Sequence, residues 1–252
     1  MKRSRRHIVR WSRTQSIIAA VTLFIIAIPA TSVGQTKKDY LILGVQSFDK
    51  GQYQEAIEQY NKALALDMNF VEALNNRGNT YNQLGLFDQA ISDLNKAIYL
   101  SPVFAPAYVN RGYVYYNKRD YSKAIADFNK ALMIDSNLAD AYLNRGSAFE
   151  KISEYDKALA DFNAAIKINP LDADAYNNRG FIYAAYRKEY DKAIADFNKA
   201  IELKPDIGKA YGNRGMSYAM KGIAENAVQD FQKACSLGET NACKNLQMMQ
   251  LK

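Results

Sequence analysis

The tripeptide Asn-Arg-Gly recurs along the chain at intervals of 34 or 35 residues, and this period constrains the fold more than any other feature. It stands at 76–78, 110–112, 144–146, 178–180 and 213–215. A repeat of this length holds one helical hairpin, which cannot bury its apolar face alone, so neighbouring hairpins must stack. The sequence therefore predicts an all-α, open solenoid with a concave surface for a partner.

Each period is predicted to contain two helices whose faces fit together. Tyr108, Gly112 and Tyr115 share one face of the first helix, because they are four and three residues apart. After the polar break at 118–120, the same spacing recurs in Ala124, Phe128 and Ala131. Small residues allow the two helices to approach and the rings fill the space between them, so we expect tightly packed hairpins.

The same spacing continues upstream of the first tripeptide, around Gly44 and Ala56, which gives six helix-turn-helix repeats. Their predicted bounds are about 38–71, 72–105, 106–139, 140–173, 174–208 and 209–238, within a repeat domain at 35–238. A C-terminal capping helix is expected at 239–252. Repeat five has one extra residue around Tyr186 to Tyr190, which should lengthen a turn without breaking the stack.

The chain resembles the tetratricopeptide repeat (TPR) family over about four fifths of its length. The resemblance rests on a glycine series, Gly44, Gly78, Gly112, Gly146, Gly180 and Gly215, and on paired alanines such as Ala56 and Ala63. One departure is that the family often has Leu before the glycine, whereas here only Leu43 does and five repeats have Arg. The resemblance implies a right-handed superhelical solenoid that serves as a scaffold and binds another protein.

Each of these arginines precedes an aspartate in the second helix of its own repeat. The pairs are Arg77 and Asp93, Arg111 and Asp127, Arg145 and Asp161, Arg179 and Asp196, and Arg214 and Asp230. Repeat one lacks both members and has Leu43 and Gln59 instead. Because the two residues are present or absent together, we expect an internal ion pair that joins the two helices. A ligand-binding row of arginines is the alternative.

The N-terminal residues 1–34 have the layout of a secretory signal peptide. Six basic residues precede an apolar run from Ile17 to about Ala30, and Ser32 and Gly34 offer small residues for cleavage. We expect a mature chain that starts near Gln35 and is periplasmic or secreted. The alternative is an uncleaved membrane anchor through 17–33, although the apolar run is shorter than a usual span. Residues 4–10 also resemble a twin-arginine motif, so the export route stays open.

Removal of the leader changes which function classes the composition allows. Lys and Arg fall from 33 to 27 against 26 Asp and Glu, so no basic excess favours nucleic acid. His7, the only histidine, is lost as well, and no phosphate loop or nucleophile elbow is present. We therefore predict a protein that is not an enzyme and needs no cofactor or metal, with membrane contact only if the leader is uncleaved.

Cys235 and Cys243 are the only cysteines and lie near the C-terminus. Their segment is similar to the Sel-like repeats, relatives of the TPR in which such a pair bridges two helices of a hairpin. This resemblance implies a disulfide, and the even cysteine count with a secretory leader agrees with an oxidising compartment. Two packed free thiols in a cytosolic protein are the alternative.

A row of asparagines is the candidate binding site. Asn76, Asn110, Asn144, Asn178 and Asn213 each stand two residues before a repeat's glycine. This offset turns the side chain about 200 degrees around the helix axis, away from the paired helix and towards the inner surface. Amides offer donors and acceptors to the main chain of an extended peptide. The row resembles the asparagine ladder of the enzyme that attaches N-acetylglucosamine to proteins.

Tyr113, Tyr116 and Phe181 are expected to add apolar contacts to the same surface. Asparagines that only bridge neighbouring helices are the alternative to the ladder. For the whole chain, the leading hypothesis is an exported adaptor that captures an extended segment of a partner protein. A structural subunit of a cell-envelope complex, docked to folded surfaces, is the second hypothesis.

Overall fold

The computed structural model describes residues 35–250, which form helices joined by short turns with no strand among them. The predicted leader at 1–34 lies outside the described residues. Within the described part, no helix is both long and apolar enough to cross a bilayer. Contacts divide the helices into two units, one at residues 35–136 and the other at 137–250, and each is described here by itself.

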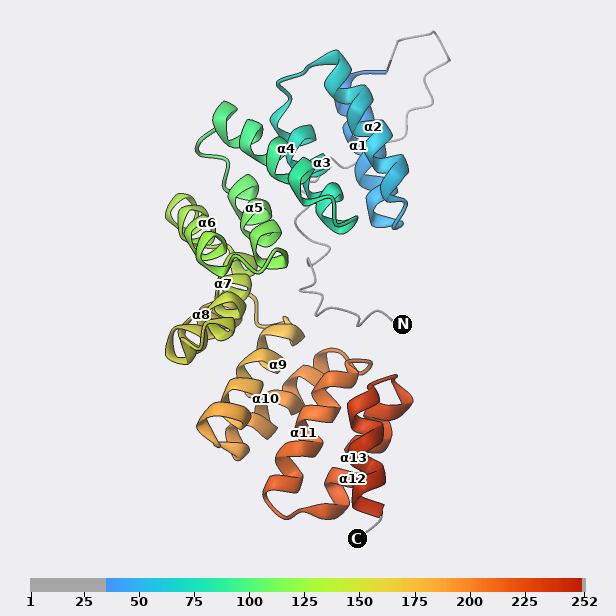
Figure 1. Cartoon of the computed structure of the whole chain (residues 1–252), viewed down its shortest axis with the longest axis vertical. Helices are drawn as coiled ribbons and strands as arrows, with labels where there is room; N and C mark the ends of the chain where they lie inside the picture. Colours follow the sequence, from blue (N-terminus) through green and yellow to red (C-terminus); the bar gives the residue numbers. More distant parts are fainter. Residues whose placement is uncertain (1–34, 251–252) are drawn as a thin grey trace. The chain divides into compact units, whose positions relative to one another are not determined.

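The first unit contains three helical hairpins. Its helices are α1 (Lys37–Asp49), α2 (Tyr53–Leu66), α3 (Val71–Gln83), α4 (Phe87–Leu100), α5 (Ala105–Asn117) and α6 (Tyr121–Ile134). Each odd-numbered helix packs against the even-numbered helix that follows it, as Figure 1 shows for α1 and α2. The first helices of successive hairpins, α1, α3 and α5, also contact one another. We call these odd-numbered members the A helices and their partners the B helices.

The second unit repeats this arrangement and adds a final helix. Its elements are α7 (Ala139–Lys151), α8 (Tyr155–Ile168), α9 (Ala173–Ile182), η1 (Tyr183–Arg187), α10 (Tyr190–Leu203), α11 (Gly208–Met220), α12 (Ala224–Ser236) and α13 (Thr240–Gln250). The A helix α9 contacts both α7 and α11, and α13 packs on α12. The predicted fold class, an all-α repeat solenoid, is confirmed.

The glycine of each A helix lies against the aromatic or leucine side chain of its B helix. At Gly112, an added Cβ would lie 2.8 Å from Cε1 of Phe128, whose ring is fully buried. Gly146 and Gly180 meet Phe162 and Phe197 in the same way. The alanines on either side of these rings, such as Ala124 and Ala131, have no exposed surface. The predicted match of small and large residues therefore forms the core of each hairpin.

We expect Gly112→Ala to destabilise the protein by about 2 kcal/mol, because the methyl group must displace a buried ring. Gly212→Ala is the matched control: it lies in the A helix α11, where an added Cβ meets nothing closer than 3.8 Å. There the better helix propensity of alanine should stabilise by up to about 1 kcal/mol. Urea unfolding followed by circular dichroism measures both changes, and equal effects would contradict this account of the packing.

The extra residue of repeat five lies in a helix and not in a longer turn, which corrects the sequence prediction. Helix α9 continues into η1, a π-helical turn, and Lys188 then ends it in the left-handed region at φ 56°. The hairpin of α9 and α10 still packs through Gly180 and Phe197. The wider turn absorbs one residue without shifting this contact, and this is why the stack continues.

Candidate functional site

All five predicted arginine–aspartate pairs form, and each joins the A helix to the B helix of its repeat. In every pair, Nε and Nη2 of the arginine donate to the two carboxylate oxygens over 2.6 to 2.8 Å. The aspartates are buried, with 4 to 8% of their surface exposed. Hydrogen bonding to Asp127 raises the pKa of Arg111 despite burial. A charge held in this way is poorly available to a ligand.

Arg77, Arg111, Arg179 and Arg214 also bond the preceding repeat, a contact that the sequence analysis missed. Nη1 of Arg111 donates to Asn95 on α4 over 2.6 Å, and Arg179 reaches Asn163 in the same way over 2.7 Å. Arg77 and Arg214 bond Asn61 and Asn198. The signal was present in the chain, because an asparagine stands two residues after Gln59 and after the aspartates of repeats two to five.

This contact explains why the end repeats differ. Repeat one has no preceding repeat, and Leu43 stands where an arginine would bond backwards. Repeat six has Gln232 in place of the asparagine, and α13, the next helix, has Leu246 at the position of the arginine. The arginine and its asparagine are therefore present only where two consecutive repeats can share them.

Two of the five asparagines in the row are buried, which corrects its assignment as a uniform peptide-facing ladder. Asn110 and Asn144 are each only 2% exposed, while Asn76, Asn178 and Asn213 are half-buried. Nδ2 of Asn110 donates to Oδ1 of Asn75 on the preceding A helix over 2.8 Å. The sequence analysis turned this side chain away from the B helix, but the preceding A helix, α3, packs against α5 and bonds Asn110.

Other members of the row make similar bonds between A helices. Asn178 donates to Oγ of Ser147 over 3.5 Å, and Asn213 donates to Oδ1 of Asn177 over 3.3 Å. Asn76 accepts from its neighbour Asn75. The bridging alternative therefore describes most of this row, and sequence reasoning missed the partners Asn75, Ser147 and Asn177.

The three predicted aromatic residues differ in exposure. Tyr113 is 5% exposed, which removes it from a surface that a peptide could touch. Tyr116 is half-buried and its ring packs edge-on against Tyr121 on the following B helix. Phe181 is also half-buried, and it borders a pocket.

This pocket, of about 270 Å³, lies between η1 and α11 in the second unit. It brings together two predicted site residues, Phe181 and Asn213, which are far apart in the sequence. Its apolar wall consists of Phe181, Ala184, Ala185, Met216 and Met220, and its polar lining of Lys188, Tyr190, Asn213 and Ser217. Met216 is 44% and Met220 60% exposed, so the wall is open to a partner. We call this set the repeat-five pocket.

The two cysteines form a disulfide between α12 and α13, with their Cα atoms 4.8 Å apart. The bond ties the last helix to repeat six. Ala242 of α13 is buried in a cluster with Phe231 and Ala234 of α12, and Leu246 and Met249 of α13 pack against this cluster. Helix α13 therefore covers the apolar end of the second unit.

A further titratable group in this unit is Asp140, which lies in the first turn of α7 and is 6% exposed. Its Oδ2 atom is buried with no hydrogen-bond partner among the described residues. Burial raises the pKa of Asp140 to about 6, and the charge of Asp172 adds to the effect. An aspartate in the unfolded chain has a pKa of about 3.9.

The folded protein therefore binds a proton here between about pH 4 and 6 that the unfolded chain does not bind. The contribution of Asp140 to the free energy of unfolding falls as the pH rises through that window, and it stays low at higher pH. We expect Asp140→Asn to stabilise the protein by about 2 kcal/mol at pH 7 and to leave it nearly unchanged at pH 4. Urea unfolding at both pH values measures this, and an equal change at the two would contradict it.

Comparison with protein families finds a match over most of the repeat region. The profile described as a tetratricopeptide repeat matches residues 71–104, 105–138, 139–171 and 173–207, and a second, described as a TPR repeat, matches 46–85. A comparison with curated proteins finds no match.

Solved structures with the same fold include two of similar size. YrrB, a TPR protein with an unusual peptide-binding site, is 25% identical with a TM-score of 0.59, over 75% of this chain and 97% of that one. A tetratricopeptide repeat protein from Parabacteroides merdae is 27% identical with a TM-score of 0.64, over 86% and 84%. A chain of the APC/C hetero-tetramer Cut9–Hcn1 is 19% identical with a TM-score of 0.78; the match covers 85% of this chain and 43% of that one and concerns the fold alone.

Proposed function

Because the chain belongs to the tetratricopeptide repeat family, we propose that this protein-interaction scaffold is an exported adaptor that captures an extended segment of a partner protein. The observation that carries the proposal is the repeat-five pocket, where open apolar side chains lie beside Asn213. A repeat scaffold of this kind binds partner proteins through its surface, and such binding requires no catalytic residue. No enzymatic role is proposed.

The site of capture is the A-helix surface at repeats five and six, and not a ladder along all repeats. Asn110, Asn144 and Tyr113 are too buried to contact a peptide. Phe181 and Asn213 stay available at the pocket. YrrB, a relative with the same fold over most of this chain, has a peptide-binding site, which supports segment binding by this chain.

Export to the periplasm or the cell exterior is part of the proposal. Two observations support it: the basic and apolar composition of residues 1–34, and the disulfide between Cys235 and Cys243, which suits an oxidising compartment. N-terminal sequencing of the purified protein tests it. A start near Gln35 supports cleavable export, whereas a start at Met1 in a membrane fraction would favour the anchor.

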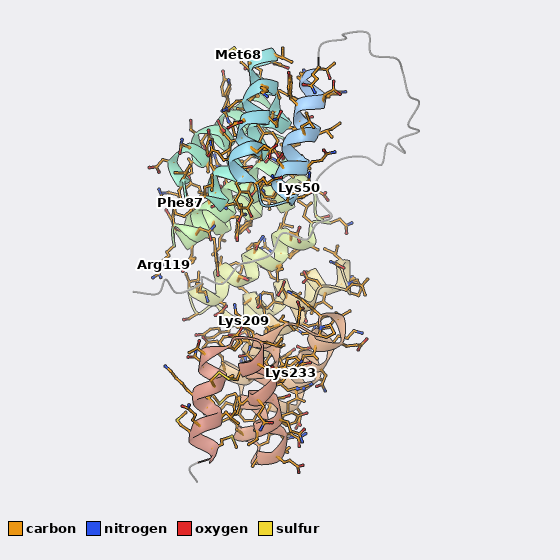
Figure 2. All side chains as sticks on the ribbon, turned by 90° about the vertical axis from the view of Figure 1, so that its right-hand side faces the viewer. Lys50, Met68, Phe87, Arg119, Lys209 and Lys233 are labelled. Carbon is orange, nitrogen blue, oxygen red and sulfur yellow. A yellow bond between two sulfur atoms is a disulfide. The ribbon has the colours of Figure 1, made fainter. Side chains whose placement is uncertain are left out.

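The second candidate, a structural subunit of a cell-envelope complex, is favoured by a different surface. Five apolar side chains of the first unit are 59 to 84% exposed at or after the ends of B helices: Leu66, Met68, Tyr99, Val103 and Met133. Figure 2 shows Met68 at one end of the α1–α2 hairpin and Lys50 at the other. We call these five the B-helix-end patch, and a folded partner could cover it.

A capture experiment with two matched variants separates the two candidates. The mature protein from Gln35 is immobilised on a support and incubated with envelope extract, and the captured proteins are identified. Phe181→Ser with Met216→Ser alters the pocket, and Met68→Ser with Tyr99→Ser alters the B-helix-end patch. The adaptor proposal expects loss of capture only with the first variant, and competition by an unfolded segment of the captured protein. Loss only with the second variant, without such competition, would instead support the assembly subunit.

A further inference from the structure

The repeat-five pocket exists because repeat five differs from the other repeats at two points. The π-helical turn η1 is the only such turn among residues 35–250 and directly precedes Lys188. In addition, Ala184 and Ala185 stand where repeats two, three and four carry the longer pairs Asn82–Gln83, Tyr116–Asn117 and Glu150–Lys151. The wide turn and the missing side chains leave about 270 Å³ open.

The walls of this space suit a large apolar side chain. Phe181 forms one side and Met216 and Met220 of α11 form the other, and both methionines have substantial exposed surface. Methionine side chains are flexible and polarisable, so they adapt to aliphatic or aromatic partners. An inserted side chain would remove apolar surface on both sides of the pocket from water.

The polar rim suits a peptide main chain and a carboxylate. Nδ2 of Asn213 is used in its bond to Asn177, and Oδ1 has no partner among the described residues, so it can accept a main-chain N–H. Arg187, Lys192 and Lys221 near the pocket pair with Asp156, Glu189 and Asp191. Lys188 is exposed, and within residues 35–250 no ion pair involves it, so its ammonium group can turn towards a carboxylate of a bound segment.

We propose that the repeat-five pocket binds a bulky apolar side chain of an extended segment, and that Lys188 pairs with a carboxylate next to it. This specificity rests on the proposed function and narrows it. The carboxylate can belong to a neighbouring Asp or Glu side chain or to the C-terminus of the segment. Both sources present the same group to Lys188.

Fluorescence polarisation with labelled eight-residue peptides tests the proposal on the mature chain from Gln35. The peptides share a Gly-Ser background and an amidated C-terminus, and contain Phe-Glu, Phe-Gln or Ser-Glu at the centre. A fourth peptide ends in Phe with a free carboxylate. We expect Phe-Glu or the fourth peptide to bind about tenfold more tightly than Phe-Gln, and Ser-Glu to show no binding. Equal binding of all four would overturn the proposal.

Two variants and a control locate the binding. Ala184→Asn with Ala185→Gln copies repeat two, fills the pocket and should abolish binding of every Phe peptide. Lys188→Gln should remove the preference for a carboxylate and leave Phe-Gln binding unchanged. Lys167→Gln, which removes another exposed lysine in the same unit, should change nothing. Equal losses with Lys188→Gln and Lys167→Gln, or unchanged binding in the filled pocket, would contradict the proposed contacts.

The capture experiment keeps this result distinct from the proposed function. One outcome is that the variant with the filled pocket still captures a partner, in competition with an unfolded segment of that partner. This result would leave the adaptor function standing and exclude the repeat-five pocket as its site. If the unaltered protein captures no partner in competition with an unfolded segment, the adaptor function itself is rejected.

Discussion

Replacing Arg111 by Ala is expected to lower the free energy of unfolding by about 3 kcal/mol, because Asp127 is left buried without its cation. The carboxylate is 6% exposed and accepts two hydrogen bonds from Arg111, over 2.8 and 2.7 Å. The third bond, to Asn95, ties this repeat to the one before it. The variant therefore weakens both a hairpin and the contact between neighbouring repeats. Urea unfolding followed by circular dichroism measures the loss.

Two matched variants separate these contributions. Asn95→Ala removes only the contact between repeats and should cost about 1 kcal/mol. Arg111→Leu with Asp127→Gln copies Leu43 and Gln59 of repeat one and removes both charges, so it should recover at least half of the loss. If the double variant is as unstable as Arg111→Ala, an unpaired buried carboxylate is not the cause.

Loss of the disulfide is expected to destabilise the C-terminal end by about 2.5 kcal/mol, because the bond closes a short loop in the unfolded chain. The cysteines are separated by 8 residues, and the bond fixes α13 on α12. In a repeat protein, stability passes only between neighbours, so the effect should be local. In a Cys235→Ala, Cys243→Ala variant, amides of α12 and α13 should exchange with deuterium faster than in the parent, and those of α7 should not.

The redox state provides the control for this prediction. A reducing agent should lower the stability of the parent protein and leave the double variant unchanged. Thiol labelling of the unreduced, denatured parent should find no free thiol. Two labelled thiols per chain, or faster exchange spread evenly from α7 to α13, would show that the bond does not hold this end of the chain.

The prediction of repeats, hairpins and arginine–aspartate pairs was possible because these features depend on contacts inside one repeat. Gly112 meets Phe128, and Arg111 meets Asp127, at fixed separations that recur in successive repeats. Periodicity therefore reveals them without knowledge of neighbouring repeats. The partner Asn95 lies in the preceding repeat, and its regular position in the chain was a signal that was not used.

The sequence by itself determined the helical period and the core of each hairpin, because local spacing specifies which residues share a helix face. Only the tertiary structure decided which of those faces a partner can reach. Asn110 is buried where the preceding A helix packs on it and accepts its hydrogen bond, whereas Asn213 borders a pocket because η1 widens and Ala184 and Ala185 leave space beside it. The position of a residue along a helix specifies the direction of its side chain. The packing of the neighbouring helix then determines whether that side chain is accessible to a partner.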